Sequence, residues 1–115
     1  MQYLLMIALD ESASAGATQA EADAMTAEYD EFGAKMAARG VLSGGARLRP
    51  VADATTVQVR NGEVLTTDGP FAETKEQLAG YYMVECKDLD EAIEVAGQIP
   101  GARFGSIEVR PIWAE

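Results

Sequence analysis

The sequence contains no histidine and only one cysteine, Cys86. Without histidine the chain has neither a Ser-His-Asp nor a Cys-His catalytic group, and it cannot build a histidine-rich zinc site. A single cysteine excludes an intrachain disulfide and a thiolate metal cage. Cys86 lies in a strand-like segment, where we interpret it as a small buried hydrophobic residue. We therefore expect no metal ion and no other cofactor.

Basic residues are also few, because nine Lys and Arg stand against 19 Asp and Glu and leave a net charge of −10. The nine are scattered along the chain rather than gathered in a patch, so we expect no direct contact with nucleic acid. The same acidity disfavours anionic membranes. No apolar run is long enough to span a bilayer, and no basic leader segment precedes the apolar residues after Met1. These absences predict a cytoplasmic protein.

What is present is a chain of 115 residues with 48% hydrophobic side chains, which suits a single domain, residues 1–115, with one core. Asn61-Gly62 stands between two β-rich runs, 55–60 and 63–67, and is a strong signal for a β-hairpin. Paired glycines early in a further strand indicate a bulge or a close approach of backbone. Besides the hairpin arms, apolar alternation predicts strands at residues 2–9, from Val41 onward, at 80–86 and at 106–110.

Two helices are predicted by their caps and apolar stripes. Thr18 and Glu21 fit a capping box, and Gly40 supplies the end of that first helix. Asp88 is placed to cap the second helix. The segment 72–78 is predicted to form a short helical turn. The stripes expected to be buried are Met25, Tyr29, Phe32 and Met36 in the first helix, and Leu89, Ala92, Ile93 and Ala96 in the second.

The order of these elements predicts an α+β fold. Setting the hairpin aside leaves βαββαβ, a ferredoxin-like unit with an inserted β-hairpin. Two helices cover only one face of such a sheet, yet the strands at 3–9 and 81–86 are apolar on both faces. The uncovered face would expose on the order of several hundred Å² of apolar surface. We expect a second copy to cover it in a homodimer, with a ligand pocket between helices and sheet or at the seam.

Residues 65–80 hold the densest cluster of unusual residues. Gly69 and Pro70 must end the strand before them, and Phe71 is expected to anchor the loop by inserting into a core or pocket. Asp68 has two interpretations. Its carboxylate can accept hydrogen bonds from the following backbone N–H groups in an Asx-turn, which is the simpler interpretation. It can also point into a cleft as a catalytic base or ligand anchor.

Three further side chains are candidates for ligand binding, beside Phe71. Arg47 and Arg49 alternate with Leu48, so they share a face that is either a solvated edge or a site for a carboxylate or phenolate. Tyr82 is either a core residue with its hydroxyl at an edge or part of a pocket wall. Surface arginines and core tyrosines need no ligand, so the structural interpretation is favoured for each.

The run from Asp68 to Glu76, Asp-Gly-Pro-Phe-Ala-Glu-Thr-Lys-Glu, followed by Gly80, resembles the signature of the DGPF-type branch of the YCII-related proteins. This resemblance implies a ferredoxin-like domain that pairs into a dimeric α+β barrel. The family is largely without an assigned activity. A few relatives are enzymes, for example in dehydrochlorination of a chlorinated aromatic ring, and other members are encoded beside extracytoplasmic-function sigma factors. Related proteins often carry a histidine near the position of Phe104.

Two functions are therefore weighed. The first is a non-catalytic dimeric module that binds a small molecule or regulates a protein partner in a sigma-factor system. The second is a lyase-type or isomerase-type enzyme in which Asp68, buried near Phe71, abstracts a proton from a small substrate. The absence of histidine, and Gln58 in place of an arginine common in the family, favour the binding module.

Overall fold

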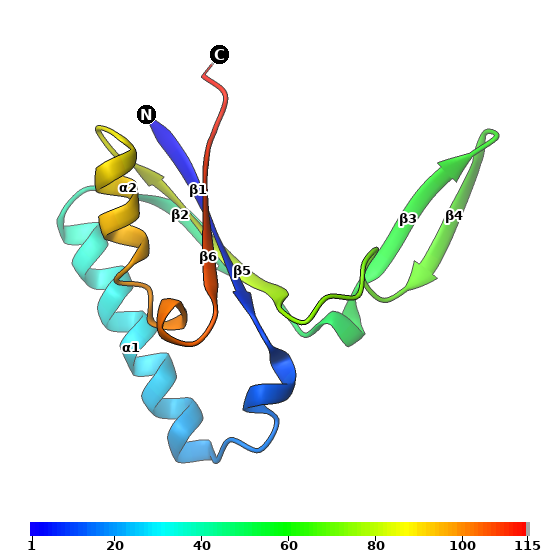
Figure 1. Ribbon diagram of the computed structural model, residues 1–115, viewed down its shortest axis with the longest axis horizontal. Helices are drawn as coiled ribbons and strands as arrows, with labels where there is room; N and C mark the ends of the chain where they lie inside the picture. The colour runs from blue at the N-terminus through cyan, green and yellow to red at the C-terminus, as the bar shows by residue number, and fades with distance from the viewer. Residues whose placement is uncertain (115) are drawn as a thin grey trace.

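The computed structural model describes residues 1–114 and has a four-stranded antiparallel sheet with two helices on one side of it (Figure 1). The prediction of a mixed α+β fold is confirmed. With the hairpin set aside, the order along the chain is strand, helix, strand, strand, helix, strand, as a βαββαβ unit requires. The sheet is built, in spatial order, from β2 (Leu42–Arg47), β5 (Gln77–Glu85), β1 (Gln2–Leu9) and β6 (Ser106–Pro111).

The first helix, α1 (Gln19–Ala38), begins and ends as its sequence predicts. The Thr18 hydroxyl accepts a hydrogen bond from the Glu21 N–H, and the Glu21 carboxylate accepts one from the Thr18 N–H. Gly40 follows the helix with a φ of 76°, a conformation that favours glycine. Phe32 and Met36 are buried against the sheet, which confirms the second half of the predicted stripe, whereas Met25 and Tyr29 are partly buried.

The second helix, α2 (Leu89–Ala96), is capped by the Asp88 carboxylate, but its buried stripe differs from the prediction. Ala92, Val95 and Ala96 are buried, whereas Leu89 and Ile93 are 49% and 52% exposed. The buried side chains follow helical spacing that continues to Ile99. Ile93 is rotated about 100° from Ala92 around the helix axis and so falls outside that stripe.

One face of the sheet carries the core. In β1, Tyr3, Leu5 and Ile7 are buried under the helices. Val84 and Cys86 join them, which confirms Cys86 as a buried hydrophobic residue, and burial raises the pKa of its thiol. Gly45 passes so close to β5 that a Cβ there would lie 2.7 Å from the Tyr81 carbonyl oxygen. A shift of register next to Gly44 confirms the predicted bulge.

The inserted hairpin forms a sheet of its own and projects away from the domain (Figure 1). It consists of β3 (Thr55–Arg60) and β4 (Glu63–Asp68), joined by Asn61 and Gly62 with φ of 52° and 76°. Both values are positive, as a type I′ turn demands, so the hairpin prediction is confirmed. The name "arm" is used below for residues Thr55 to Asp68.

The segment that returns from the arm to the sheet is irregular, so the predicted helical turn at 72–78 is wrong. The strand β5 already begins at Gln77, opposite Leu9, and uses the backbone that a helix would need. The Thr74 hydroxyl donates to the Glu76 carbonyl, which gives that backbone a local partner outside any helix. Three short 3-10 helices complete the chain: η1 (Glu11–Ser14), η2 (Val51–Asp53) and η3 (Pro100–Arg103).

No helix within residues 1–114 has the length and apolar character needed to cross a bilayer.

Candidate functional site

The base of the arm is tied to the sheet by polar side chains. The Glu11 carboxylate accepts from the Val51 N–H at 3.1 Å, and the Glu11 N–H donates to the Gln77 side-chain oxygen at 3.0 Å. The Ser106 hydroxyl donates to the Glu76 carboxylate at 2.8 Å. These bonds join residues 30 to 66 positions apart. No local motif in the sequence signals them, so sequence reasoning missed Glu11 and Gln77.

Asp68 is the last residue of β4 and is held by its backbone neighbours rather than by its own side chain. The Gly69 N–H donates to the Ala54 carbonyl at 2.7 Å, and the Thr56 hydroxyl donates to the Gly69 carbonyl at 2.7 Å. Gly69 has a φ of 99°. Within residues 1–114, the Asp68 carboxylate makes no hydrogen bond and no ion pair. The expected Asx-turn is therefore absent, and this exposed carboxylate is left free for a ligand.

Phe71 does not insert into the core of its own chain. Its side chain is 88% exposed, in contrast to the expected anchor. The physical reason is the backbone around it. Residues 69–76 return from the arm to β5 without forming a helix or strand, and they hold Phe71 away from the core. Asp68 and Phe71 thus lie close in sequence but enclose no cavity within one copy.

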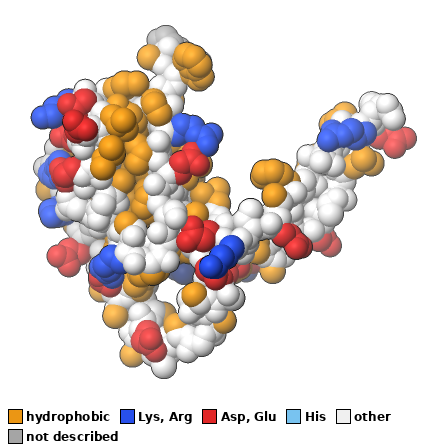
Figure 2. All heavy atoms as spheres, viewed as in Figure 1, with side chains coloured by type: hydrophobic (Ala, Val, Ile, Leu, Met, Phe, Trp, Pro, Cys, Tyr) orange, Lys and Arg blue, Asp and Glu red, His pale blue; other side chains and the backbone are white. Residues whose placement is uncertain are grey.

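The arm has one apolar face that nothing within residues 1–114 covers. Residues directly opposite each other in an antiparallel pair share a face. Val59 lies opposite Val64, and Val57 lies opposite Thr66 on that same face. The three valines are 60%, 58% and 68% exposed in chain order. Figure 2 shows hydrophobic side chains along the projecting arm. The name "valine face" is used for Val57, Val59 and Val64.

The other predicted ligand-binding residues lie apart from Asp68. Arg49 follows the end of β2 and pairs with Asp53, with 2.9 Å between Nε and Oδ2, as a surface ion pair. Arg47 is an exposed residue at the last position of β2, so the two arginines are not neighbours on one strand. Tyr82 packs on the helix side, with its ring centre 5.0 Å from that of Phe32, and burial raises the pKa of its hydroxyl. The structural interpretation fits Arg49 and Tyr82.

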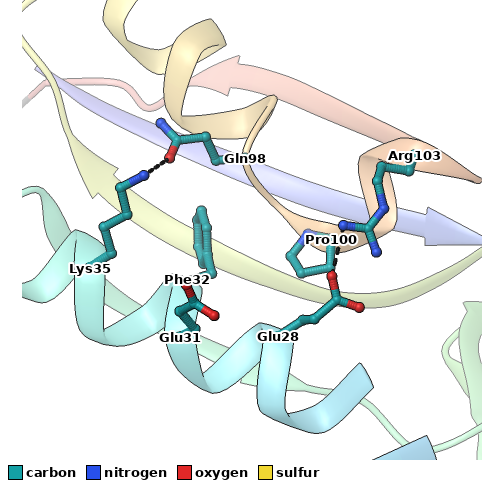
Figure 3. A pocket seen from close by; sticks show the side chains of 7 residues that line it. All are labelled: Glu28, Glu31, Phe32, Lys35, Gln98, Pro100 and Arg103. Atoms are coloured by element: carbon teal, nitrogen blue, oxygen red, sulfur yellow. Dashed lines mark hydrogen bonds and ion pairs between the residues drawn. The ribbon is translucent and has the colours of Figure 1, made fainter. Parts of the chain in front are cut away.

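A small depression of about 170 Å³ lies between α1 and the segment that follows α2 (Figure 3). Three of its four charged side chains already have a partner in the depression, and Glu31 is the fourth. Lys35 donates to the Gln98 side chain at 2.7 Å, and Arg103 lies 2.8 Å from Glu28. The Arg103 hydrogen bond lowers the pKa of Glu28. Self-paired groups at a small site offer little to a ligand, so this depression is a weak candidate.

A larger hollow of about 750 Å³ lies where the two ends of the chain meet the sheet. Gln2, Glu85 and Trp113 line it, together with Met1, Ser43, Ile112 and Ala114. Trp113 is the only tryptophan in the chain and is 93% exposed. The volume is in the range typical of small-molecule pockets, but the hollow is open on the side away from the chain.

Beside this hollow, the face of the sheet opposite the helices is bare and apolar; we call it the open face. Leu4 lies opposite Met83, and Met6 lies opposite Tyr81. All four side chains are partly exposed, which confirms the prediction that β1 and β5 are apolar on both faces. Among residues 1–114, no three His, Cys, Asp or Glu side chains converge in a way that would hold a metal ion.

Comparison with known proteins places the chain in a family. A family model described as YCII-related domain matches residues 1–115. The chain belongs to the YCII-related family. It is 38% identical over 114 residues to uncharacterized protein R00369 of Rhizobium meliloti (strain 1021), an alignment that covers 97% of this chain and 92% of that protein. Neither the family description nor the name of this YCII-related relative states an activity.

Proposed function

We propose that this YCII-related protein is a cytoplasmic homodimer of the DGPF type, a dimeric α+β barrel that binds a small molecule at the seam between its two copies. The observation that carries the proposal is the open face. Leu4, Met6 and Tyr81 with Met83 form a continuous apolar surface on a sheet whose helices all lie on the other side. Soluble chains rarely leave such a surface in water, and an identical sheet is its simplest cover.

The charge on the open face supports self-association. The chain carries a net charge of −10, so two copies repel each other over most of their surfaces. On the open face, the charge of Glu108 is offset by Arg110, with which it pairs. Glu85 lies at the edge of the face, at the last position of β5. Two such faces therefore approach with less repulsion than acts between the acidic surfaces elsewhere.

A second copy would also change the hollow lined by Trp113. Gln2 lies opposite Glu85, and both continue the rows of the open face toward the chain ends. A partner sheet laid over that face therefore narrows the open side of the hollow. An enclosed cavity with an indole, an amide and a carboxylate suits a small polar or aromatic metabolite. A regulatory role beside a sigma factor is the wider setting that we propose for such a ligand-binding dimer.

An enzyme is the second candidate, and one observation favours it. The Asp68 carboxylate is free of hydrogen bonds and ion pairs within residues 1–114, while the backbone around it is fixed by two bonds of 2.7 Å. A carboxylate held in this way has the freedom that a general base needs. The reaction would be a proton abstraction with elimination or isomerisation. Asp68 lacks a second catalytic group beside it, so binding remains the preferred function.

The homodimer is tested by charging the centre of the open face. Met6→Lys places an ammonium group among Leu4, Tyr81 and Met83, and we expect sedimentation to show a folded monomer. Leu89→Lys is the matched control, because Leu89 is an exposed residue on α2, and it should leave the dimer intact. A parent chain that sediments as a single subunit across micromolar concentrations would overturn the proposal.

The ligand is sought by thermal shift with a library of small carboxylates, phenols and other metabolites, with the parent and Asp68→Asn compared. A compound that raises Tm in the parent supports binding, and turnover of that compound supports the enzyme. If the Asn variant turns the compound over at the parent rate, Asp68 is not the base. A library without any stabilising compound contradicts the ligand-binding function.

A further inference from the structure

We infer that the arm is a clasp, whose valine face packs against a second copy of this chain and carries Asp68 to the seam between the copies. This inference rests on the proposed homodimer and goes beyond it, because it assigns a partner contact to a segment outside the four-stranded sheet. The observation behind it is that the arm forms a separate two-stranded sheet with an uncovered apolar face.

A free two-stranded hairpin is marginally stable in water at best. The arm nevertheless has full pairing from Thr55–Asp68 to Arg60–Glu63. Its valine face is more than half exposed at every position. Three β-branched side chains on one face of a hairpin are what a strand pair presents to a packing partner. The chain itself supplies no such partner within residues 1–114, so the missing contact comes from outside the copy.

The area of the open face points to the same partner. The strands of the sheet lie about 4.8 Å apart and rise about 3.3 Å per residue, so the open face covers roughly 450 Å². Two copies joined by that face alone bury about 900 Å², below the range of about 1,200–2,000 Å² typical of stable pairs. An arm with two strands about 20 Å long covers roughly 200 Å² of a partner. Two arms, counted on both sides of each contact, bring the total to about 1,700 Å².

Charge and symmetry favour a second copy over any other occupant. The side of the arm that holds the valine face has one charged residue, Asp68, at the base of the arm. Arg60 and Glu63 lie on the opposite side. A strongly acidic partner or an anionic membrane gains nothing from such a surface. A second copy brings a bare apolar sheet of its own, and the two-fold symmetry of a pair places both arms in equivalent contacts.

The contact would also place Asp68 at the seam between the two copies. Asp68 lies opposite Thr55, and Thr55 is two residues before Val57 on β3. The Asp68 carboxylate is therefore on the same side of the arm as the valine face. Docking that face brings two Asp68 carboxylates to the seam, one from each arm. The site is then complete only in the pair, because the arm that carries Asp68 belongs to one copy and the surface that it meets belongs to the other.

The test compares dimer dissociation by sedimentation over a dilution series of the full chain. In the variant Val57→Thr, Val59→Thr, Val64→Thr the side chains keep their shape and their strand preference but lose apolar surface. We expect the dissociation constant to rise by at least about tenfold. Leu65→Thr is the control on the opposite face of the arm, where Leu65 lies opposite Gln58, and it should leave the constant unchanged.

Amide hydrogen exchange of the parent gives an independent readout. We expect the amides of the arm to be protected at concentrations where the chain is dimeric and to exchange quickly on dilution to monomer. A parent that never dimerises overturns the homodimer and the clasp together. A stable parent dimer whose arm amides exchange quickly overturns the clasp alone. The same holds if the triple variant has the dissociation constant of the parent. The clasp is also overturned if Leu65→Thr raises the dissociation constant as much as the triple variant does.

Discussion

Arg39 at the end of α1 joins the two helices through its guanidinium group. It donates to both carboxylate oxygens of Glu94, at 3.0 Å and 2.8 Å, and lies 3.7 Å from Glu91. This bidentate arrangement is the favourable geometry for an arginine and a carboxylate. The hydrogen bond from Arg39 lowers the pKa of Glu94 below its ordinary 4.5. Both groups are accessible to solvent, so the pair makes a small contribution to stability.

The pair predicts a dependence of stability on pH. Since the pKa of Glu94 is lowered by folding, its contribution is complete above pH 4.5 and is lost as the pH falls through the folded pKa. We expect Glu94→Gln to lower the free energy of unfolding at neutral pH. Below pH 4.5, the free energy of unfolding of this variant should fall less steeply with pH than that of the parent. Urea unfolding at fixed protein concentration measures both. Glu73→Gln, in the exposed loop, should keep the decline of the parent, and an unchanged slope in Glu94→Gln contradicts the assignment.

Single residues show where sequence reasoning works and where it stops. Thr18 with Glu21, and Gly40, act on backbone groups within four positions, so their roles follow from the sequence. Phe71 is different, because its surroundings depend on how the arm leaves the sheet. Asp68 could be identified as unusual from its Gly-Pro neighbours, but its free carboxylate depends on a backbone bond from Gly69 to Ala54, across the hairpin.

Among the elements, the arm is the one whose turn fixes its shape. Asn61 and Gly62 both have positive φ, and only a few residue types adopt this without strain. We expect Gly62→Ala to destabilise the arm by about 1–2 kcal/mol, the cost of a left-handed conformation for a residue with a Cβ. Faster amide exchange across residues 55–68 would show it.

Gly62→Asn is the matched variant for that experiment, because asparagine tolerates the left-handed region better than alanine does. It should recover part of the lost protection. Exchange in α1 should be the same in all three proteins, since the arm forms a sheet separate from the core. Equal protection in the alanine variant and the parent would show that the turn does not determine the stability of the arm.

Elements with strong local signals were predictable, and those shaped by distant contacts were not. The hairpin, both helix starts and the bulge in β2 follow from local residue chemistry. The segment 72–78 has helix-forming residues, but Gln77 pairs with Leu9 of β1, a strand nearly seventy residues earlier in the sequence. Leu89 is exposed at the first position of a short helix and Ile93 lies beside the buried stripe, and only the position of the sheet decides which side chains are buried.

For the whole molecule, the flat shape of the single copy is the main observation. It measures 47 × 44 × 19 Å, and the helices, the sheet and the projecting arm lie beside one another across its two longer dimensions (Figure 1). Apolar residues on both faces of β1 and β5 predicted a bare face correctly. The direction of the arm was not predictable, since a hairpin pattern gives the pairing within the arm but not its orientation to the sheet.

The single tryptophan gives a direct signal for assembly. Trp113 is 93% exposed beside the open face, so its emission in a monomer should be that of a fully hydrated indole. We expect the emission to shift to shorter wavelength as concentration rises, with the same midpoint as dimer formation in sedimentation. Met6→Lys should show no shift at any concentration. Dimer formation without a change in emission would place Trp113 outside the interface.

The arm is joined to the rest of the chain by two short segments and takes no part in the buried core. Its sequence is therefore free to diverge while the sheet and helices stay the same. If the arm is the clasp that we propose, it is the segment by which one of several YCII-related chains with similar apolar sheets could pair with its own copies and not with the others. Grafting the arm of one relative onto another would then redirect which subunits pair.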